Sequence, residues 1–391
     1  MYNILTLNNI SEEGLKRLPT DKYAVADNAG DPAGILVRSC KMHDMELGAS
    51  LEAVARAGAG VNNIPIDKLS ARGVPVFNAP GANANAVKEL VIGGMLLAAR
   101  NLAHAWSYTQ TLEGEGDALA KAVEAGKKKF VGYELPGRTL GVVGLGAIGV
   151  RVANAALDLG MNVIGFDAMI SVERAWELHS GVQQARSLED LLTRSDMVTL
   201  HVPLLDATRG LISKEGIARM PVGAVILNFA RDPIVDEAAV LESLDAGHLG
   251  CYVTDFPTRQ LIDNDKVITL PHLGASTAEA EINCAIMVAD NMRNYLENGN
   301  VRYSVNFPEA DLPRTNAHRL TVANENVPNM VGQVSTFLAD AGLNIEDLLN
   351  KSRGELAYTI VDLDGPVSDD MIGQIAGIEG VLKVRNLGQP V

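Results

Sequence analysis

Short apolar runs separated by polar or glycine-bearing segments of helical length recur along the first part of the chain. The runs are found at residues 4–7, 34–37, 54–55 and 74–77. Runs of this length bounded by turn residues are typical of buried strands, and helical spacers between them indicate parallel strands with crossover helices. We therefore expect a parallel α/β sheet in this part of the chain.

The same rhythm returns with stronger runs between residues 140 and 270. These runs are LGVVG, NVIGFD, MVTLHVP, AVILNFA, GCYVTDF and KVITLP. Each stops at or just before a glycine, a proline or a charged residue, as strands of a doubly wound parallel sheet do. Residues 277–298 predict a long helix leading out of this second domain, because apolar residues share one face, namely Ile282, Ala285, Ile286, Ala289 and Met292.

The C-terminal part of the chain has a different order of elements. Residues 304–316, SVNFPEADLPRTN, contain two prolines and no periodicity, which predicts a linker. Beyond it the pattern predicts a strand, a helix, two strands, a helix and a strand at residues 319–323, 330–341, 344–349, 356–363, 369–376 and 381–387. A βαββαβ order of this size is typical of a ferredoxin-like module.

A glycine-rich turn follows the apolar run at residues 140–143 and precedes a helical segment at residues 150–159. The G-x-G-x-x-G spacing is formed by Gly144, Gly146 and Gly149, with Ala147 and Ile148 inside the loop. Such glycines permit a tight turn, close approach of backbone to a pyrophosphate, and close packing of helix on strand. This context predicts a dinucleotide-binding loop.

Asp167 ends the next strand, at a spacing from Gly144 that is close to the one usual for this motif. An acid at this position accepts hydrogen bonds from the hydroxyls of the adenosine ribose. No arginine stands beside it to compensate a 2′-phosphate, because Ala168, Met169 and Ile170 follow. We therefore expect NAD rather than NADP.

The amino-acid composition excludes several classes of binding partner for this protein. The chain has 33 Lys and Arg against 48 Asp and Glu, a net charge of −15, which argues against nucleic acid and against anionic membrane surfaces. Cys40, Cys251 and Cys284 are too scattered for a disulfide framework or a cysteine metal site. The longest apolar stretch, residues 91–99, is far shorter than the ~20 residues that cross a bilayer. We expect a cytoplasmic protein without a metal.

Two side chains follow strands of the second domain and suit the oxidation of a 2-hydroxy acid. His272 comes after the run at residues 267–270, and its imidazole can exchange a proton near neutral pH. Arg231 ends the run at residues 224–230, and its planar guanidinium can bind a carboxylate through two hydrogen bonds. Carboxyl ends of parallel strands are where such sheets bind ligands.

Six stretches together resemble the D-isomer-specific 2-hydroxyacid dehydrogenases: ARAGAGVNNIPID, NAPGANANAVKEL, LGVVGLGAIG, HVPL, NFARDPIVDE and PHLGAST. They span the chain from about residue 30 to residue 300. The resemblance implies two flavodoxin-like or Rossmann-like doubly wound domains, and we add the ferredoxin-like module. The expected boundaries are a substrate-binding domain at 1–98 and 276–306, an NAD-binding domain at 99–275, a linker at 307–317 and the module at 318–391.

The resemblance also assigns roles to residues. Arg231 and His272 match the family's catalytic Arg and His. Positions matching cofactor contacts are His201, Pro203, Phe229, Ala230, Asp255, Gly274 and Ala275, with Asp255 placed at the nicotinamide carboxamide by a one-residue shift. Positions matching substrate contacts are Arg38, Arg56, Ala59, Gly60 and Asn83. Among these, Arg38 and Arg56 resemble phosphate ligands, which an acidic chain needs in order to hold an anionic substrate.

One family feature is missing. The family's Glu that hydrogen-bonds the catalytic His falls on Arg259 without a gap and on Gln260 with the one-residue shift. No carboxylate therefore matches that position. Asp255, Asp263 and Asp265 are the nearby acids, and the sequence leaves the choice among them open.

The C-terminal module, residues 318–391, resembles an ACT domain, a regulatory module of amino-acid enzymes. In serine-inhibited relatives the amino acid lies between two such modules, at positions that match Asn324, Asn326 and Asn344; Asn324 replaces the usual His. Asparagine amides can bind both the ammonium and the carboxylate of an amino acid. L-serine is thus a possible effector, and the alternative is a module used for dimerisation alone.

The resemblance is strongest to the branch of the family that oxidises D-3-phosphoglycerate to 3-phosphohydroxypyruvate with NAD, the first step of L-serine biosynthesis. It implies a homodimer or homotetramer. One alternative is a dehydrogenase or reductase of another 2-hydroxy acid, such as glyoxylate or hydroxypyruvate. Another is a catalytically weak NAD-binding regulator, which the missing Glu favours and which Arg231 and His272 oppose.

Overall fold

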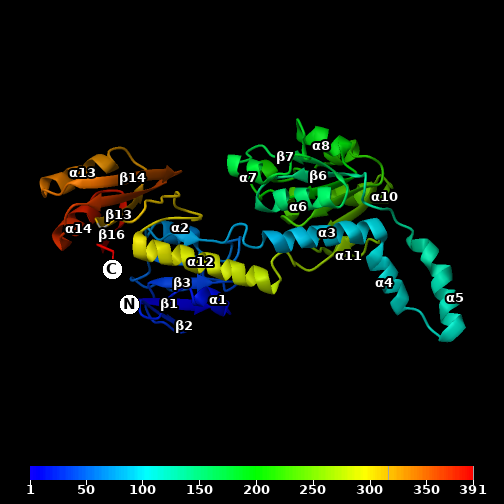
Figure 1. The fold of residues 1–391 in the computed structure, drawn as a ribbon, viewed down its shortest axis with the longest axis horizontal. Coiled ribbons are helices and arrows are strands. Elements are labelled where there is room, and N and C mark those ends of the chain that lie inside the picture. Colours follow the sequence, from blue (N-terminus) through cyan, green and yellow to red (C-terminus); the bar gives the residue numbers. More distant parts are fainter. Residues whose placement is uncertain (316, 391) are drawn as a thin grey trace. The chain divides into compact units, whose positions relative to one another are not determined.

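The computed structural model describes residues 1–315 and 317–390. They form two compact units, one made of residues 1–83 and 278–391 and the other of residues 84–277 (Figure 1). The second unit begins at Ala84 and not at residue 99, because Val87, Val91 and Met95 pack into its core. Within the described residues no helix is both long enough and apolar enough to span a membrane.

A five-stranded parallel sheet forms the N-terminal part of the first unit. Its strands are β1 (Tyr2–Leu7), β2 (Tyr23–Ala26), β3 (Gly34–Val37), β4 (Ala53–Arg56) and β5 (Val76–Phe77), in the order β2-β1-β3-β4-β5. This is the flavodoxin-like order. The helices of this part are α1 (Glu12–Leu15), α2 (Ile66–Ser70) and α12 (Ala278–Asn298).

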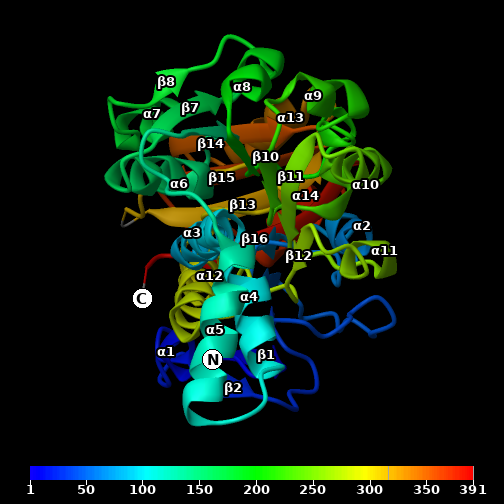
Figure 2. The ribbon, with the colours of Figure 1, turned by 90° about the vertical axis from the view of Figure 1, so that its right-hand side faces the viewer.

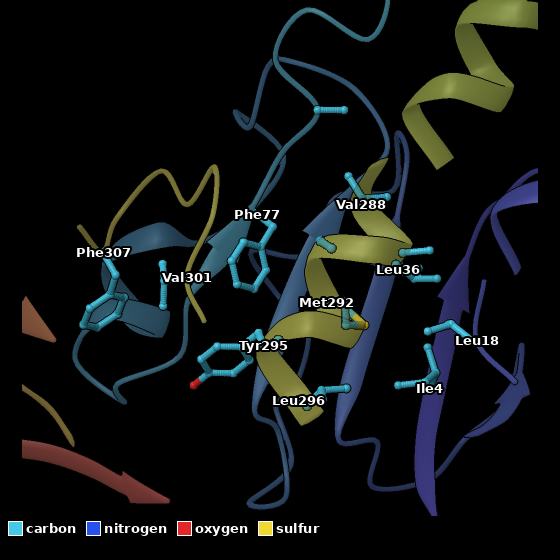
Figure 3. Packing of buried hydrophobic residues seen from close by; sticks show 14 of the residues in the cluster. Ile4, Leu18, Leu36, Phe77, Val288, Met292, Tyr295, Leu296, Val301 and Phe307 are labelled. Atoms are coloured by element: carbon cyan, nitrogen blue, oxygen red, sulfur yellow. The ribbon is translucent and has the colours of Figure 1, made fainter. Parts of the chain in front are cut away.

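Helix α12 covers one face of that sheet, although the whole second unit separates the two in the sequence. Its residues Val288, Met292 and Tyr295 are buried, and Figure 3 shows them turned toward strand residues that include Leu36 and Phe77. The expected return of a C-terminal helix to the N-terminal domain is therefore observed.

The second unit contains a seven-stranded parallel sheet. Its strands are β6 (Thr139–Val143), β7 (Asn162–Phe166), β8 (Gln183–Gln184), β9 (Met197–Leu200), β10 (Ala224–Asn228), β11 (Leu249–Thr254) and β12 (Val267–Thr269). The order β12-β11-β10-β9-β6-β7-β8 contains the Rossmann order 3-2-1-4-5-6, read from β8 to β11, with β12 added at the edge.

Helices surround this sheet and extend beyond it. The α-helices are α3 (Ala84–Arg100), α4 (Leu102–Gln110), α5 (Gly116–Gly126), α6 (Ala147–Asp158), α7 (Val172–Glu177), α8 (Leu188–Arg194), α9 (Lys214–Arg219), α10 (Glu237–Asp245) and α11 (Arg259–Ile262), and the 3₁₀ helices are η1 (Lys127–Phe130), η2 (Asp206–Thr208) and η3 (Asp232–Ile234). Figure 2 shows α4 and α5 side by side, and the Tyr108 hydroxyl joins them by donating to the Ala122 carbonyl at 2.9 Å.

The C-terminal module has the predicted βαββαβ order. It consists of β13 (His318–Glu325), α13 (Met330–Asp340), β14 (Ile345–Arg353), β15 (Leu356–Leu363), α14 (Asp369–Ala376) and β16 (Val381–Gly388). The strands form an antiparallel sheet in the order β14-β15-β13-β16. The predicted fold class, two doubly wound domains and a ferredoxin-like module, is confirmed.

The segment expected to be a linker is packed. Phe307 and Ala310 are buried, and Ala310 forms an isolated β-bridge with Val301. The segment also accepts hydrogen bonds from the buried Arg319, which donates to the carbonyls of Leu312 and Pro313. Buried apolar side chains and hydrogen-bonded carbonyls fix this segment. The prolines and the missing periodicity predicted a linker because neither of these contacts can be read from the local sequence. Residue 316 of the expected linker lies outside the described residues.

Strand β16 fastens the module to the rest of the first unit. The buried Arg385 donates to the carbonyls of Tyr295 and Leu296 at the end of α12, both at 3.0 Å, and pairs with Glu52 at 2.8 Å. Lys383 also pairs with Glu52, at 3.1 Å. Because a helix C-terminus attracts cations, Arg385 makes a favourable contact with α12.

Candidate active site

Each glycine of the loop between β6 and α6 has its own structural reason. Gly144 has a φ of +91°, and a Cβ there would lie 2.5 Å from the carbonyl oxygen of His201. A Cβ on Gly149 would collide with the carbonyl of Gly144. A Cβ on Gly146 would meet nothing within 4 Å, so the backbone there is open to a ligand.

The beginning of α6 is suited to an anion. The N–H groups of Gly146, Ala147 and Ile148 precede the first intrahelical hydrogen bond, in which Val150 donates to the carbonyl of Gly146 at 3.1 Å. The first turn of α6 contains no acidic residue. Because free N–H groups and the helix dipole favour negative charge, this loop fits the pyrophosphate of a dinucleotide.

Asp167 is tied to the same loop. Its Oδ2 accepts from the backbone N–H of Leu145 at 2.6 Å, and its Oδ1 accepts from that of Met169 at 2.7 Å. The half-buried carboxylate thus stands beside the glycines, where a ribose hydroxyl would reach it. The fit supports a dinucleotide without a 2′-phosphate.

His201 follows β9 and is neutral. Its Nε2 lies 3.0 Å from the Thr199 hydroxyl, and burial lowers the pKa of the imidazole to about 3. An uncharged ring can form part of the wall of an adenosine site. Pro203, two residues on, is exposed, and its carbonyl accepts from the Thr208 hydroxyl at 2.6 Å.

Arg231 is presented by a loop that a buried amide holds. The Asn228 side chain at the end of β10 donates to the carbonyl of Arg231 at 3.0 Å and accepts from the N–H of Ala230 at 3.2 Å. Phe229, between them, is buried against Gly94. The Arg231 side chain itself is exposed. The sequence predictions do not include Asn228, although it is the one polar residue inside the apolar run AVILNFA.

His272 and Asp255 follow neighbouring strands. Thr254 of β11 is paired with Thr269 of β12, and the N–H of Leu270 donates to the carbonyl of Thr254 at 2.9 Å. This register brings the residues after both strands together. The rings of Phe256 and His272 meet edge to face, with centroids 5.2 Å apart. His272 is exposed, Gly274 is buried and Ala275 is half-buried.

Four of the expected substrate residues of the first unit lie at or just after the carboxyl ends of β3 and β4, and the fifth, Asn83, lies between β5 and α3. Arg38 forms an ion pair with Glu281 of α12, and Arg56 donates through Nε to the carbonyl of Arg38 at 2.9 Å. The carbonyl of the exposed Ala59 accepts from Asn78 at 2.6 Å. Gly60 and Asn83 are partly exposed.

A cavity of about 640 Å³ opens at these strand ends. It is lined by Ser39, Lys41, His43, Arg56, Asn62 and Asn63. The Asn63 side chain is 8% exposed and donates to the carbonyl of Cys40 at 2.8 Å, whereas its Oδ1 has no donor among the described residues. The sequence predictions do not include Lys41 and His43, although two basic residues close behind Arg38 point to an anion site. The cavity can hold an anion that also carries a hydrogen-bond donor.

Comparisons with known proteins agree with this geometry. Residues 92–274 match the model of the D-isomer specific 2-hydroxyacid dehydrogenase, NAD binding domain. A D-3-phosphoglycerate dehydrogenase of Haemophilus influenzae is 33% identical over 355 residues, which cover 88% of this chain and 83% of the relative. One of Bacillus subtilis is 35% identical over 326 residues, covering 79% of this chain and 59% of the relative.

A solved structure gives the same result. The crystal structure of NAD+-bound 3-phosphoglycerate dehydrogenase of Entamoeba histolytica superposes with a TM-score of 0.61 at 28% identity, over 78% of this chain and 98% of the other. The matched family domain contains the glycine loop, Arg231 and His272 and is described as NAD-binding, as the loop predicts. The chain therefore belongs to the D-isomer specific 2-hydroxyacid dehydrogenase family.

Proposed function

We propose that this protein oxidises D-3-phosphoglycerate to 3-phosphohydroxypyruvate with NAD. The observation that carries the proposal is that Arg231 and His272 follow strands of the same parallel sheet as the dinucleotide loop. All three stand at the edge formed by the carboxyl ends of the strands, which is where such sheets bind ligands.

The roles follow from the chemistry of the side chains. NAD, when bound, supplies the acceptor for the hydride that leaves carbon 2 of the substrate. His272 takes the proton of the substrate hydroxyl, and returns it in the reverse direction. Arg231 binds the substrate carboxylate through its guanidinium, and the amide of Asn228 holds the loop that presents it.

The lined cavity of the first unit supports a phosphorylated substrate. Lys41 and Arg56 bring positive charge to this cavity in a chain of net charge −15, and His43 adds a ring that can hydrogen-bond. A phosphate needs such charge once it leaves water. The unsatisfied Oδ1 of Asn63 suits the P–OH of a phosphate monoanion or a hydroxyl group. Arg38 already pairs with Glu281, so we assign it to shaping the site rather than to binding phosphate alone.

The test is NAD reduction with a panel of 2-hydroxy acids. We expect the highest kcat/KM with D-3-phosphoglycerate, and D-glycerate serves as the matched substrate without phosphate. Preference for glycolate or D-glycerate, or for glyoxylate or hydroxypyruvate in the reverse direction, would favour the first alternative. NAD binding without turnover of any substrate would favour a regulator.

The module supports regulation by L-serine only in an oligomer. Asn326 follows the end of β13 and Asn344 precedes β14; because β13 and β14 are parallel, these residues lie at opposite ends of the sheet. One amino acid can contact both only if one comes from a second copy. Asn324 is 2% exposed and donates to the carbonyl of Glu325, so we assign it no ligand. Calorimetry with L-serine on the wild type, Asn326→Ala and Asn344→Ala tests this.

A homodimer or homotetramer is supported by the pair α4 and α5. Its exposed apolar residues include Leu102, Trp106 and Val123, and clustered exposed apolar side chains mark interaction surfaces. Light scattering coupled to gel filtration measures the oligomer. We place the protein in the cytoplasm, which its three free cysteines support.

A further inference from the structure

The position that supplies a carboxylate to the catalytic His in relatives is occupied by a cation or an amide here. Arg259 is largely exposed and pairs with Asp263, at 2.9 Å through Nε and 2.5 Å through Nη2. Gln260 carries no charge. Asp263 is engaged by Arg259, and Asp265 is exposed. Of the three nearby acids, Asp255 is therefore the candidate partner of His272.

Asp255 has the placement that a partner of His272 needs. It is the first residue after β11, and the pairing of Thr254 with Thr269 brings it beside the residues after β12. It is only 1% exposed, and its Oδ1 has no hydrogen-bond donor among the described residues. The next side chain, Phe256, packs its ring against the imidazole of His272. The buried carboxylate of Asp255 thus has an oxygen that can still accept a hydrogen bond, and it lies close to the imidazole of His272, whose ring N–H can donate one.

The local electrostatics agree with this pairing. Burial raises the pKa of Asp255, while His272 and the N–H groups of Leu273 and Gly274 act in the opposite direction by favouring the carboxylate. The charged groups on the neighbouring elements are Arg231 and Asp232 after β10, Asp236 and Glu237 at the start of α10, and Arg259 and Asp263 on and after α11. Asp236 caps α10, and Glu237 accepts from the Thr258 hydroxyl at 2.8 Å.

We propose that Asp255 is the positioning residue of His272, in place of the Glu of relatives. It accepts a hydrogen bond from one ring nitrogen, which leaves the other ring nitrogen to exchange the proton of the substrate hydroxyl. Its negative charge favours the protonated imidazole, the form that donates a proton to the keto acid. This inference rests on the proposed function, because it refines the proton transfer at the same site.

The pH dependence of Asp255→Asn tests the proposal in both directions of the reaction. Removal of the charge makes the imidazole easier to deprotonate. Oxidation requires the neutral imidazole, and reduction requires the imidazolium. The acid limb of the pH profile of kcat/KM for oxidation and the alkaline limb for reduction therefore both move to lower pH, by about 1 to 3 units. Turnover at neutral pH in the reductive direction falls at least tenfold, because less imidazolium is available. Asp255→Glu restores part of both effects. Asp263→Asn is the matched control and keeps the wild-type limbs.

A second readout does not depend on turnover. The ring of His272 is followed by NMR on the full-length enzyme with labelled histidine, and its signal is assigned by its loss in His272→Gln. Its titration midpoint falls in Asp255→Asn and stays in Asp263→Asn. If both limbs of the pH profiles of kcat/KM and the titration midpoint of His272 are the same in Asp255→Asn as in the wild type, the proposal is overturned, even if activity drops. A wild type that fails to oxidise any 2-hydroxy acid overturns the proposed function instead, while the NMR titration still decides the pairing.

Discussion

Arg319 and Asp362 form a two-pronged ion pair in which Nε and Nη2 each lie 2.6 Å from a carboxylate oxygen, and neither side chain is more than 2% exposed. The remaining N–H groups of Arg319 serve the carbonyls of Asn298, Leu312 and Pro313. One guanidinium thus joins the first strand of the module to the end of α12 and to the segment between them.

Replacement of Arg319 by Leu should destabilise the protein by about 3 to 5 kcal/mol, because Asp362 is left buried without a partner. Thermal or urea denaturation measures the loss. The double variant Arg319→Leu/Asp362→Leu should recover part of it. Arg259→Ala, which breaks an exposed pair, is the control and should cost no more than about 1 kcal/mol. A loss in Arg319→Leu equal to that of the control would contradict this account.

Asp255→Asn should raise stability at neutral pH while it lowers activity. Burial raises the pKa of Asp255 above its ordinary value, so the folded state prefers the protonated carboxyl. The stability that this carboxyl contributes is present below about pH 4 and is lost as the pH rises through the raised pKa. The melting temperature of the NAD-free variant should therefore exceed that of the wild type at pH 7 and approach it at pH 4. A variant less stable than the wild type at pH 7 would argue against this.

His272→Ala should lower turnover of D-3-phosphoglycerate by about 10² to 10⁴, the usual contribution of a general acid–base group. NAD affinity should be nearly unchanged, because the glycine loop and Asp167 hold the dinucleotide. Steady-state kinetics and calorimetry with NAD separate the two effects. Near-normal turnover would rule out His272 as the base.

Asp167→Ala combined with Ala168→Arg should shift the preference from NAD toward NADP. The carboxylate that repels a 2′-phosphate is removed and a cation is introduced. The measurement is the ratio of kcat/KM for the two cofactors, and Ala168→Arg alone is the control that keeps the carboxylate. An unchanged ratio in the double variant would mean that Asp167 does not face the ribose.

Lys41→Met and His43→Gln should each raise the KM for D-3-phosphoglycerate by roughly tenfold, since a hydrogen bond to a charged group is worth about 1.5 to 3 kcal/mol. The kcat/KM for D-glycerate should change little, because that substrate lacks the phosphate. Lys127→Met, on the 3₁₀ helix η1, is the control. If kcat/KM falls equally for D-3-phosphoglycerate and D-glycerate, the cavity has a structural role and does not bind the phosphate.

The sequence predicts the fold where the pattern is local. The runs at residues 34–37 and 356–363 coincide with β3 and β15, and the long helix predicted from Thr277 begins at Ala278. Short edge strands are different. The edge strand β8 (Gln183–Gln184) contains no apolar residue that could mark it, and the edge strand β2 (Tyr23–Ala26) is only four residues long.

The site is predictable to the same extent. The glycines and Asp167 follow from spacing, since the loop and its acid are close in sequence. Asp255 and the Asn63 cavity depend on which strands become neighbours, so their surroundings emerge only after folding. The packing of the segment after α12 likewise depends on Arg319, whose acceptors come from two other parts of the chain.

The first unit is interrupted in the sequence, and this affects how it can fold during synthesis. Ile4, Leu36 and Phe77 leave the ribosome before the second unit, Ala84–Thr277, whereas Val288 and Met292 leave after it. At the usual pace of protein synthesis that interval is roughly 10 to 40 s. During that time the apolar face of the sheet that α12 later covers stays exposed to solvent. A nascent chain halted near Thr277 therefore carries a complete nucleotide-binding unit next to an exposed apolar sheet face that is prone to aggregate.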